Sequence, residues 1–281
     1  MKKEKIFITV KTYPSISTSY GELVCTAGIR EDGSWIRIYP VPFRTLETWR
    51  QYKKYQWIEA LIERNEADIR PESFKVIDID NINLLDEVKN WNERKKIILS
   101  KNKIYDDLDE LIDLAKNKNL LSLAVFKPKH IKRLKIEREK EDKKRLEKKV
   151  TLKARSKQIN LFGQSFSDFE PVDRLPFKFS YVFEDIKGRE SSLMIEDWEI
   201  GVLYRNCFLN ARKKNKNLSE EELMQIAAQK VKEKYEDKFL KENDILLFLG
   251  TTKRYHKVAP NPFVIIGVFY PPKEKQLDLF F

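Results

Sequence analysis

The chain contains few glycines, cysteines and histidines. Its 281 residues include 8 glycines, 2 cysteines and 2 histidines. Neither GxGxxG nor GxxxxGK[ST] occurs, so the sequence does not predict the phosphate loops of dinucleotide-binding or ATP-hydrolysing folds. Cys25 and Cys207 lie far apart in apolar surroundings, which is typical of reduced core thiols and not of a disulfide.

Long apolar runs are also absent, because Lys, Glu or Asp interrupts each run before it reaches the length of a membrane span. The opening "MKKEKIFITVKTY" alternates with the period of a strand and has no small-residue cleavage site, so we expect no signal peptide. The cysteines and histidines are isolated from one another, without the spacing of zinc ligands. We therefore expect a cytoplasmic protein with no membrane partner, no metal site and no cofactor.

Positive charge is abundant and concentrated in one segment. The chain has 55 Lys and Arg against 44 Asp and Glu, a net charge of +11, and residues 127–157 hold 15 of the basic and 5 of the acidic residues. This segment, "KPKHIKRLKIEREKEDKKRLEKKVTLKARSK", alone contributes +10 and indicates a polyanion, with DNA as the first choice. The basic residues that we expect to contact phosphates are Lys132, Arg133, Lys143, Lys144, Arg145, Lys148 and Lys149. The alternative is a solvated helix with i,i+4 ion pairs.

The pattern of apolar residues predicts an α+β protein with two modules. Short β-branched and aromatic runs, with a hairpin signal at Asp32-Gly33, make residues 1–126 a β-rich module with a helical insert over 85–100 and 106–117. Residues 127–172 are the basic segment and a loop. Residues 173–271 are a mixed module with a small barrel-like sheet and helices, and residues 272–281 are a flexible tail.

Within the second module, strands are expected around a hairpin at Lys187-Gly188 and in the runs "DILLFLGTT" and "PFVIIGVFYPP". One helix is predicted from Trp198 to Lys214. A second begins after Ser219, where Glu222 completes a capping box, and continues to about Phe239.

The segment "GSWIRIYPVPFR" combines arginines with flat aromatic rings. At strand period, Trp35, Arg37 and Tyr39 share one face, and Arg44 follows closely. Such residues suit stacking on bases and forked contacts with phosphates, so these four are candidate nucleic-acid contacts. The alternative is a half-buried strand whose arginines extend to solvent.

Three acids cluster in "MIEDWEIGVLYRN", at the junction of a strand and a helix. Glu196, Asp197 and Glu199 are candidate Mg²⁺ ligands of a nuclease, since hard oxygen ligands are what that ion requires. The alternative is a helix cap, because no partner motif of a metal nuclease stands at a suitable distance.

The chain ends in "KEKQLDLFF". The five residues QLDLF resemble the peptide by which bacterial polymerases, mismatch-repair proteins and other replication factors bind the ring-shaped sliding clamp. In such a peptide two apolar anchors fill a pocket while the glutamine amide meets polar groups. The resemblance implies a bacterial clamp as partner, bound by Gln276, Leu277, Asp278, Leu279 and Phe280. An apolar plug that packs on the body of the protein is the alternative.

A second peptide, QINLF, follows the basic segment. It has the same frame, with Gln158, Ile159, Leu161 and Phe162 at the equivalent positions. A clamp is a symmetric dimer with two pockets, so two peptides in one chain can bind it bivalently.

Most of the chain resembles a bacterial family of uncharacterised proteins, through "KTYP", "CTAGI", "WIRIYPVPFR", "FKFSYVFED", "IEDWEIGVLYRN" and "NPFVIIGVFYPP". The closing strands resemble a PUA- or ASCH-like barrel, which implies nucleic-acid binding by analogy alone.

These observations favour a clamp-tethered, DNA-associated protein in replication, repair or defence against phage DNA. One alternative is a metal-dependent nuclease, or another enzyme acting on nucleic acids or nucleotides, that the clamp recruits. It would use Mg²⁺ at Glu196, Asp197 and Glu199. A further alternative is an RNA-binding module of the PUA type. The sequence does not decide whether the protein is an enzyme.

Overall fold

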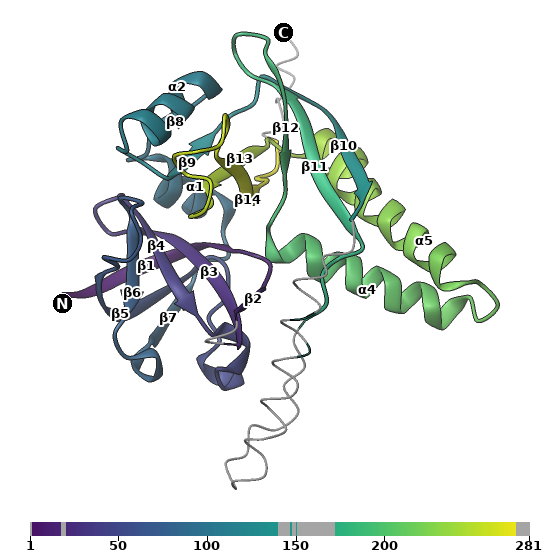
Figure 1. Ribbon diagram of the computed structural model, residues 1–281, viewed down its shortest axis with the longest axis horizontal. Coiled ribbons are helices and arrows are strands. Elements are labelled where there is room, and N and C mark those ends of the chain that lie inside the picture. Colours follow the sequence, from purple (N-terminus) through teal and green to yellow (C-terminus); the bar gives the residue numbers. More distant parts are fainter. Residues whose placement is uncertain (1, 18–20, 140–146, 148–149, 151–171, 274–281) are drawn as a thin grey trace, which may run out of the picture.

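The computed structural model describes residues 2–17, 21–139, 147, 150 and 172–273, and within them the chain has an α+β fold (Figure 1). The strands are β1 (Lys2–Lys11), β2 (Ser15–Ser17), β3 (Gly21–Arg30), β4 (Trp35–Val41), β5 (Gln56–Arg64), β6 (Ser73–Val76), β7 (Asn83–Glu87), β8 (Ile104–Tyr105), β9 (Leu123–Phe126), β10 (His130–Arg138), β11 (Phe177–Glu184), β12 (Glu190–Met194), β13 (Leu246–Thr251) and β14 (Phe263–Phe269). The α-helices are α1 (Trp91–Leu99), α2 (Leu108–Ile112), α4 (Trp198–Lys214), α5 (Glu220–Lys232) and α6 (Phe239–Glu242). The predicted α+β class is confirmed.

A closed five-stranded barrel forms the N-terminal module. Its strands follow the order β1-β3-β4-β6-β5, and β5 pairs back onto β1 with Ile58 opposite Ile6. β2 and β7 extend the barrel at β3 and β5. The turn between β3 and β4 contains Gly33 with φ of 88°, a conformation that glycine adopts without strain, so the predicted hairpin is confirmed.

An open four-stranded sheet, β14-β13-β9-β8, is the central layer of the protein. Residues alternate between its faces, and both faces are buried. One face, with Val125 and Phe248, packs on Phe7 and Ile29 from the outside of the barrel. Strands buried on both sides need apolar residues at every position, which explains the unbroken runs in β9, β13 and β14.

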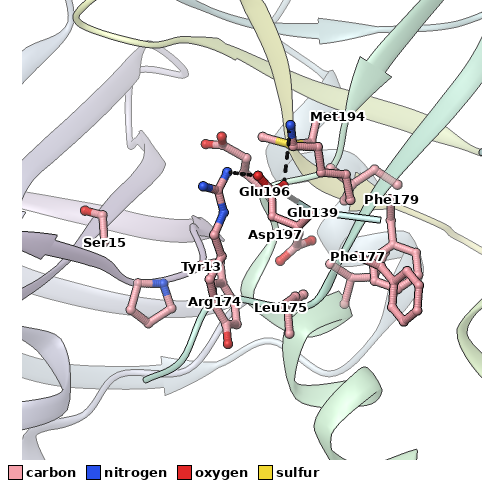
Figure 2. A pocket seen from close by; sticks show the side chains of 14 residues that line it. Tyr13, Ser15, Glu139, Arg174, Leu175, Phe177, Phe179, Met194, Glu196 and Asp197 are labelled. Carbon is pink, nitrogen blue, oxygen red and sulfur yellow. Dashed lines mark ion pairs between the residues drawn. The ribbon is translucent and has the colours of Figure 1, made fainter. Parts of the chain in front are cut away.

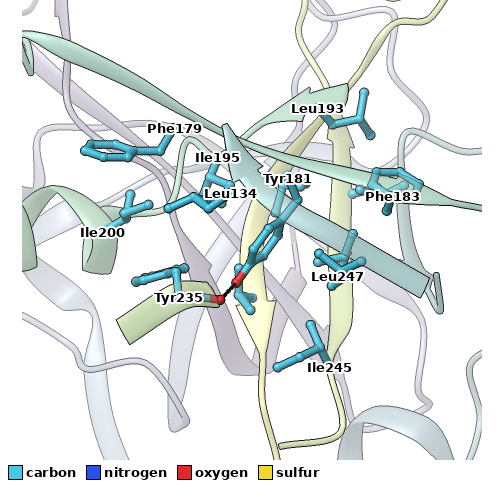
Figure 3. Close-up of a cluster of buried hydrophobic side chains, with 14 of the residues drawn as sticks. Leu134, Phe179, Tyr181, Phe183, Leu193, Ile195, Ile200, Tyr235, Ile245 and Leu247 are labelled. Carbon is cyan, nitrogen blue, oxygen red and sulfur yellow. Dashed lines mark hydrogen bonds between the residues drawn. The ribbon is translucent and has the colours of Figure 1, made fainter. Parts of the chain in front are cut away.

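The opposite face of the central sheet packs on the third layer. This layer contains the antiparallel sheet β10-β11-β12 and the helices α4 and α5, which form a hairpin that extends away from the barrel (Figure 1). Tyr181 of β11 lies at its centre, and its hydroxyl donates to the carbonyl of Tyr235 at 2.6 Å, a buried bond that satisfies the phenol (Figure 3). Leu247 of β13 packs against the same cluster.

Both long helices begin where the sequence predicted. Asp197 caps α4 by accepting from the backbone N–H of Glu199 at 3.1 Å. Ser219 and Glu222 form the predicted capping box of α5. After Lys232 the chain continues through a wider π-type turn over Glu233–Lys238 into α6.

Three predictions about the arrangement of the strands and helices need correction. Residues 104–126 were placed in the N-terminal module, but β8 and β9 belong to the central sheet with β13. The barrel-like sheet expected in the second module is this open sheet, and the closed barrel lies in the N-terminal module. The helix predicted over 85–100 begins only at Trp91, because Asn90 caps it and Asn83–Glu87 pairs with β5.

Candidate functional site in a groove between barrel and second module

Two adjoining hollows lie where the end of β1 meets the start of α4, and Tyr13, Ser15 and Glu196 line both of them. We name them the Arg174 hollow, of about 240 Å³, and the Arg37 hollow, of about 290 Å³. Their shared wall is held by the backbone, because the N–H of Tyr13 donates to the carbonyl of Glu196 at 2.7 Å. Together they form one groove between the modules.

The Arg174 hollow combines an apolar wall with a charged edge (Figure 2). Phe177 and Phe179 of β11 form part of the wall. At the edge, Glu139 accepts from Arg174 at 3.0 Å. Tyr13 closes the barrel side, and its hydroxyl donates to the carbonyl of Asp173 at 2.9 Å.

Glu196 is the predicted acid that lines both hollows, whereas Asp197 lines the Arg174 hollow alone. Burial raises the pKa of its carboxyl, against an opposing effect of Arg174. A carboxyl with a raised pKa in a hollow is a candidate proton donor or acceptor. Its place in the groove and its raised pKa make Glu196 a candidate site residue.

Asp197 and Glu199 do not form the expected magnesium site with Glu196. Both bind the buried ammonium of Lys54, Asp197 at 3.1 Å and Glu199 at 2.8 Å. Burial alone would lower the pKa of Lys54, but the two carboxylates together raise it, so the lysine stays charged. Asp197 is 1% exposed and also accepts from the backbone N–H of Val268 at 3.2 Å.

Across the described residues, no group of three or more His, Cys, Asp or Glu side chains is placed to hold a metal ion. Glu196, Asp197 and Glu199 therefore do not form a group of metal ligands in the part of the chain that the structure describes. The helix-cap alternative applies to Asp197, and its carboxylate also stabilises the junction of the two modules.

The Arg37 hollow is lined by two buried arginines. Arg37 of β4 is 2% exposed, and it donates to the carbonyl of Ser122 at 3.0 Å and to its hydroxyl at 3.1 Å. Arg70 is 4% exposed and binds Asp68 through a forked pair, with a further bond to the carbonyl of Thr251 at 2.7 Å. Cys25 lies beside Arg37, with its sulfur 3.6 Å from the guanidinium.

His256 lies behind this hollow and is fully buried. Its Nδ1 lies 2.9 Å from the Thr251 hydroxyl, and its Nε2 lies 2.7 Å from the side-chain oxygen of Asn119. Burial, with the nearby charges of Arg70 and Arg37, lowers the pKa of His256 from 6.5 to about 4. The imidazole is therefore neutral in the folded protein at physiological pH.

The neutral His256 predicts a dependence of stability on pH. Its folded pKa lies below its unfolded value, so the unfolded chain takes up the proton first. The contribution is complete above about pH 6.5 and is lost as the pH falls toward 4. From this group alone we expect the free energy of unfolding to be about 2 kcal/mol lower at pH 5 than at pH 7.

Urea unfolding of a His256→Asn variant at the two pH values measures this effect. The variant should lose that part of the pH dependence, whereas His130→Asn, at the exposed start of β10, should retain it. Identical pH profiles for His256→Asn and the unsubstituted protein would contradict the assignment.

The predicted nucleic-acid contacts separate in the structure. Arg37 and Tyr39 line the Arg37 hollow, whereas Trp35 lines another hollow and packs edge-on against Phe248. Arg44 forms a 2.9 Å ion pair with the buried Glu22. The expected single exposed face is therefore wrong for Arg37, whose guanidinium lies inside the protein.

The basic segment is described only at its start. Lys132 of β10 binds Glu184 at 2.6 Å and Glu190 at 2.8 Å, and Arg133 is exposed beside it. Lys143, Lys144, Arg145, Lys148 and Lys149 lie outside the described residues. Both clamp-like peptides, 158–162 and 276–280, lie outside them as well.

Sequence reasoning missed Tyr13, Arg70 and Lys253 as groove residues. Tyr13 lies in "KTYP", one of the stretches by which the chain resembles its family, and this resemblance is the sequence feature that could have indicated a role for Tyr13. Arg70 and Lys253 stand in no distinctive pattern, and only the packing of the two modules brings them together.

The protein is thus an α+β protein in which a closed barrel packs on a central sheet that is buried on both faces, with a groove between the two modules. The chain belongs to the family described as "Domain of unknown function (DUF8757)", whose model matches residues 104–281. A second model, "Domain of unknown function (DUF8758)", matches residues 2–100. The two matches meet between α1 and β8, at the boundary that the sheets also indicate.

Other comparisons add little. A search of curated proteins finds no match to the chain. Among solved structures, the chain is similar to one titled "Structure of murine DNA binding protein bound with ds DNA", with 10% sequence identity and a TM-score of 0.30. That similarity covers 96% of this chain and 95% of the other. A similarity at this level does not establish a shared fold. Among the described residues no helix has both the length and the apolar character needed to span a membrane.

Proposed function

We propose that the protein is a DNA-associated protein that two peptides tether to the bacterial sliding clamp, in replication, repair or defence against foreign DNA. The observation that carries the proposal is the repetition of one five-residue pattern, QLDLF at 276–280 and QINLF at 158–162, in a single chain. Each peptide supplies a glutamine amide and two apolar anchors, the combination that a small apolar pocket with a polar edge selects.

The charge of the chain supports the DNA part of the proposal. The segment 127–157 contributes +10 of the net +11, and the second peptide begins directly after it. A clamp encircles DNA, so binding to the clamp brings the basic segment to the duplex at a high effective concentration. The segment then contacts phosphates without reading sequence.

Capture by an immobilised bacterial clamp tests the tether. We expect the full-length protein to bind, and variants with one altered peptide, Leu279→Ala/Phe280→Ala or Leu161→Ala/Phe162→Ala, to bind about 30-fold more weakly or worse, because buried anchors dominate such interfaces. The variant with all four substitutions should not bind.

The chain provides a matched control for this experiment. Phe281 is as apolar as Phe280 but lies beyond the five-residue pattern. Phe281→Ala should therefore change the affinity by less than about threefold, as expected for a position outside the anchors. If the variant with all four substitutions is captured as well as the unsubstituted protein, the two peptides are not what the clamp binds.

A further inference from the structure

The Arg37 guanidinium carries a buried charge that no carboxylate of the described residues pairs at 4.0 Å or less. Its bonds run to the neutral Ser122 and to the sulfur of Cys25, and its Nε has no hydrogen-bond partner within the described chain. A buried guanidinium is costly unless an anion compensates it. The fold therefore places beside a hollow a buried cation that no described carboxylate contacts directly, and the charge of Glu72 acts on it from beyond Ser122.

A second donor is left without a partner in the same place. The hydroxyl of Thr252, just after β13, is buried and makes no hydrogen bond to a described residue. Thr252 and Arg37 belong to different modules, and both line the Arg37 hollow. Buried polar groups are normally paired, so two unpaired donors at one hollow indicate a ligand that supplies acceptors.

The charges around the hollow favour an anion. Asp68 is engaged by Arg70, and the carboxylate of Glu72 acts on the Arg37 guanidinium from beyond the hydroxyl of Ser122, to which it is bonded at 2.6 Å. Lys253 adds a further cation at the exposed rim. Glu196 is the acid among the described lining residues, and burial raises the pKa of its carboxyl.

The dimensions indicate more than a bare inorganic ion. A volume of about 290 Å³ exceeds what one tetrahedral oxyanion fills. The half-buried ring of Tyr39 and the residues Val264 and Ile266 add an aromatic and apolar part to the lining. A flat ring carried by the same ligand would pack on that part.

We propose that the Arg37 hollow binds the phosphate group of a nucleoside monophosphate or of a phosphorylated nucleic-acid end. Arg37 and Thr252 donate to the phosphate, Lys253 attracts it from the rim, and Tyr39 lies against the base. No described lining residue belongs to the clamp-like peptides or to the basic segment, so the proposal is tested independently of the tether.

Calorimetric titration of the full chain tests the proposal. The probes are inorganic phosphate, deoxythymidine 5′-monophosphate, and a thymidine dinucleotide with and without a 5′-phosphate, which is too short for the basic segment to retain. We expect the monophosphate to bind at least tenfold more tightly than inorganic phosphate. A preference for the 5′-phosphorylated dinucleotide over the monophosphate assigns the site to nucleic-acid ends, and the reverse order assigns it to free nucleotides.

Two variants and one control locate the binding. Arg37→Lys keeps the charge but removes the forked donor, and should weaken binding about 30-fold or more. Lys253→Gln, at an exposed position that does not endanger folding, should weaken it about fivefold. Lys257→Gln, exposed on the same loop but outside the lining, should change affinity less than twofold. Absence of binding of all four probes, or binding that Lys253→Gln and a folded Arg37→Lys leave unchanged, would overturn the proposal.

Discussion

Replacement of Asp197 with alanine is expected to lower the free energy of unfolding by about 4 kcal/mol, because it removes one carboxylate from a buried ion pair. Lys54 is 7% exposed at its side chain and would keep only Glu199 as a partner. The substitution also removes the cap of α4 and the acceptor of the Val268 N–H. Urea unfolding followed by circular dichroism measures the loss.

Two further substitutions serve as controls for this prediction. Asp197→Asn keeps an acceptor for the helix cap and should cost less than alanine. Glu87→Gln disrupts the surface ion pair with Lys53 and should leave the free energy of unfolding almost unchanged, because such pairs are screened by solvent. If Asp197 were instead a ligand in an empty metal site, alanine would relieve charge repulsion. Stability that is unchanged or raised would therefore contradict the pairing of Asp197 with Lys54.

The second large effect is expected in DNA binding. Replacement of Lys143, Lys144, Arg145, Lys148 and Lys149 with glutamine removes five positive charges from the basic segment. In the unsubstituted protein, each of these five residues is expected to neutralise one phosphate. Their contribution alone should lower the affinity for a duplex about 10²- to 10³-fold when the salt concentration rises from 50 to 200 mM. The variant should lose about 4 units of the slope of log affinity against log salt.

Fluorescence anisotropy with a labelled duplex measures that slope, and Lys132→Gln is the matched control. The ammonium of Lys132 is already bound by Glu184 and Glu190, so its removal should change the slope by less than about 0.5. A slope that the five substitutions leave unchanged would exclude the segment as the DNA contact. Preferential competition by RNA would favour the RNA-binding alternative.

Local patterns predicted much of the second module. The capping box at Ser219 and Glu222 predicted the start of α5, and α4 begins at the predicted Trp198 with Asp197 as its cap, because capping depends on residues two or three positions apart. The unbroken apolar runs of β13 and β14 indicated buried strands, and both faces of the sheet are indeed covered.

Long-range pairing is what local patterns could not show. Closure of the barrel depends on Ile6 meeting Ile58, and the central sheet depends on Ala124 meeting Leu249. Nothing in the amino-acid composition of these strands indicates which strand each of them pairs with. The boundary between the modules was therefore placed after residue 126, although β8 and β9 already belong to the second module.

The same limit applies to the groove. Strand period correctly put Arg37 and Tyr39 on one face of β4, but it could not say that a second module covers that face. Ser122 and Thr252, which approach Arg37 from that module, lie 85 or more positions away in sequence. Arg37, which we expected at the surface, is therefore buried by the packing of the second module and lines a hollow.

Retention on DNA that carries a loaded clamp tests the tethered, DNA-associated function most directly. Clamps are loaded onto closed circular DNA at a salt concentration that suppresses binding by the basic segment alone, and the protein is then separated from the free pool by gel filtration. We expect the unsubstituted protein to elute with the circle and to be lost when the circle is linearised and the clamp slides off. The variant with alanine at Leu161, Phe162, Leu279 and Phe280 should not be retained. Equal retention on circles with and without clamp, or retention of the four-residue variant, would contradict the tethered function.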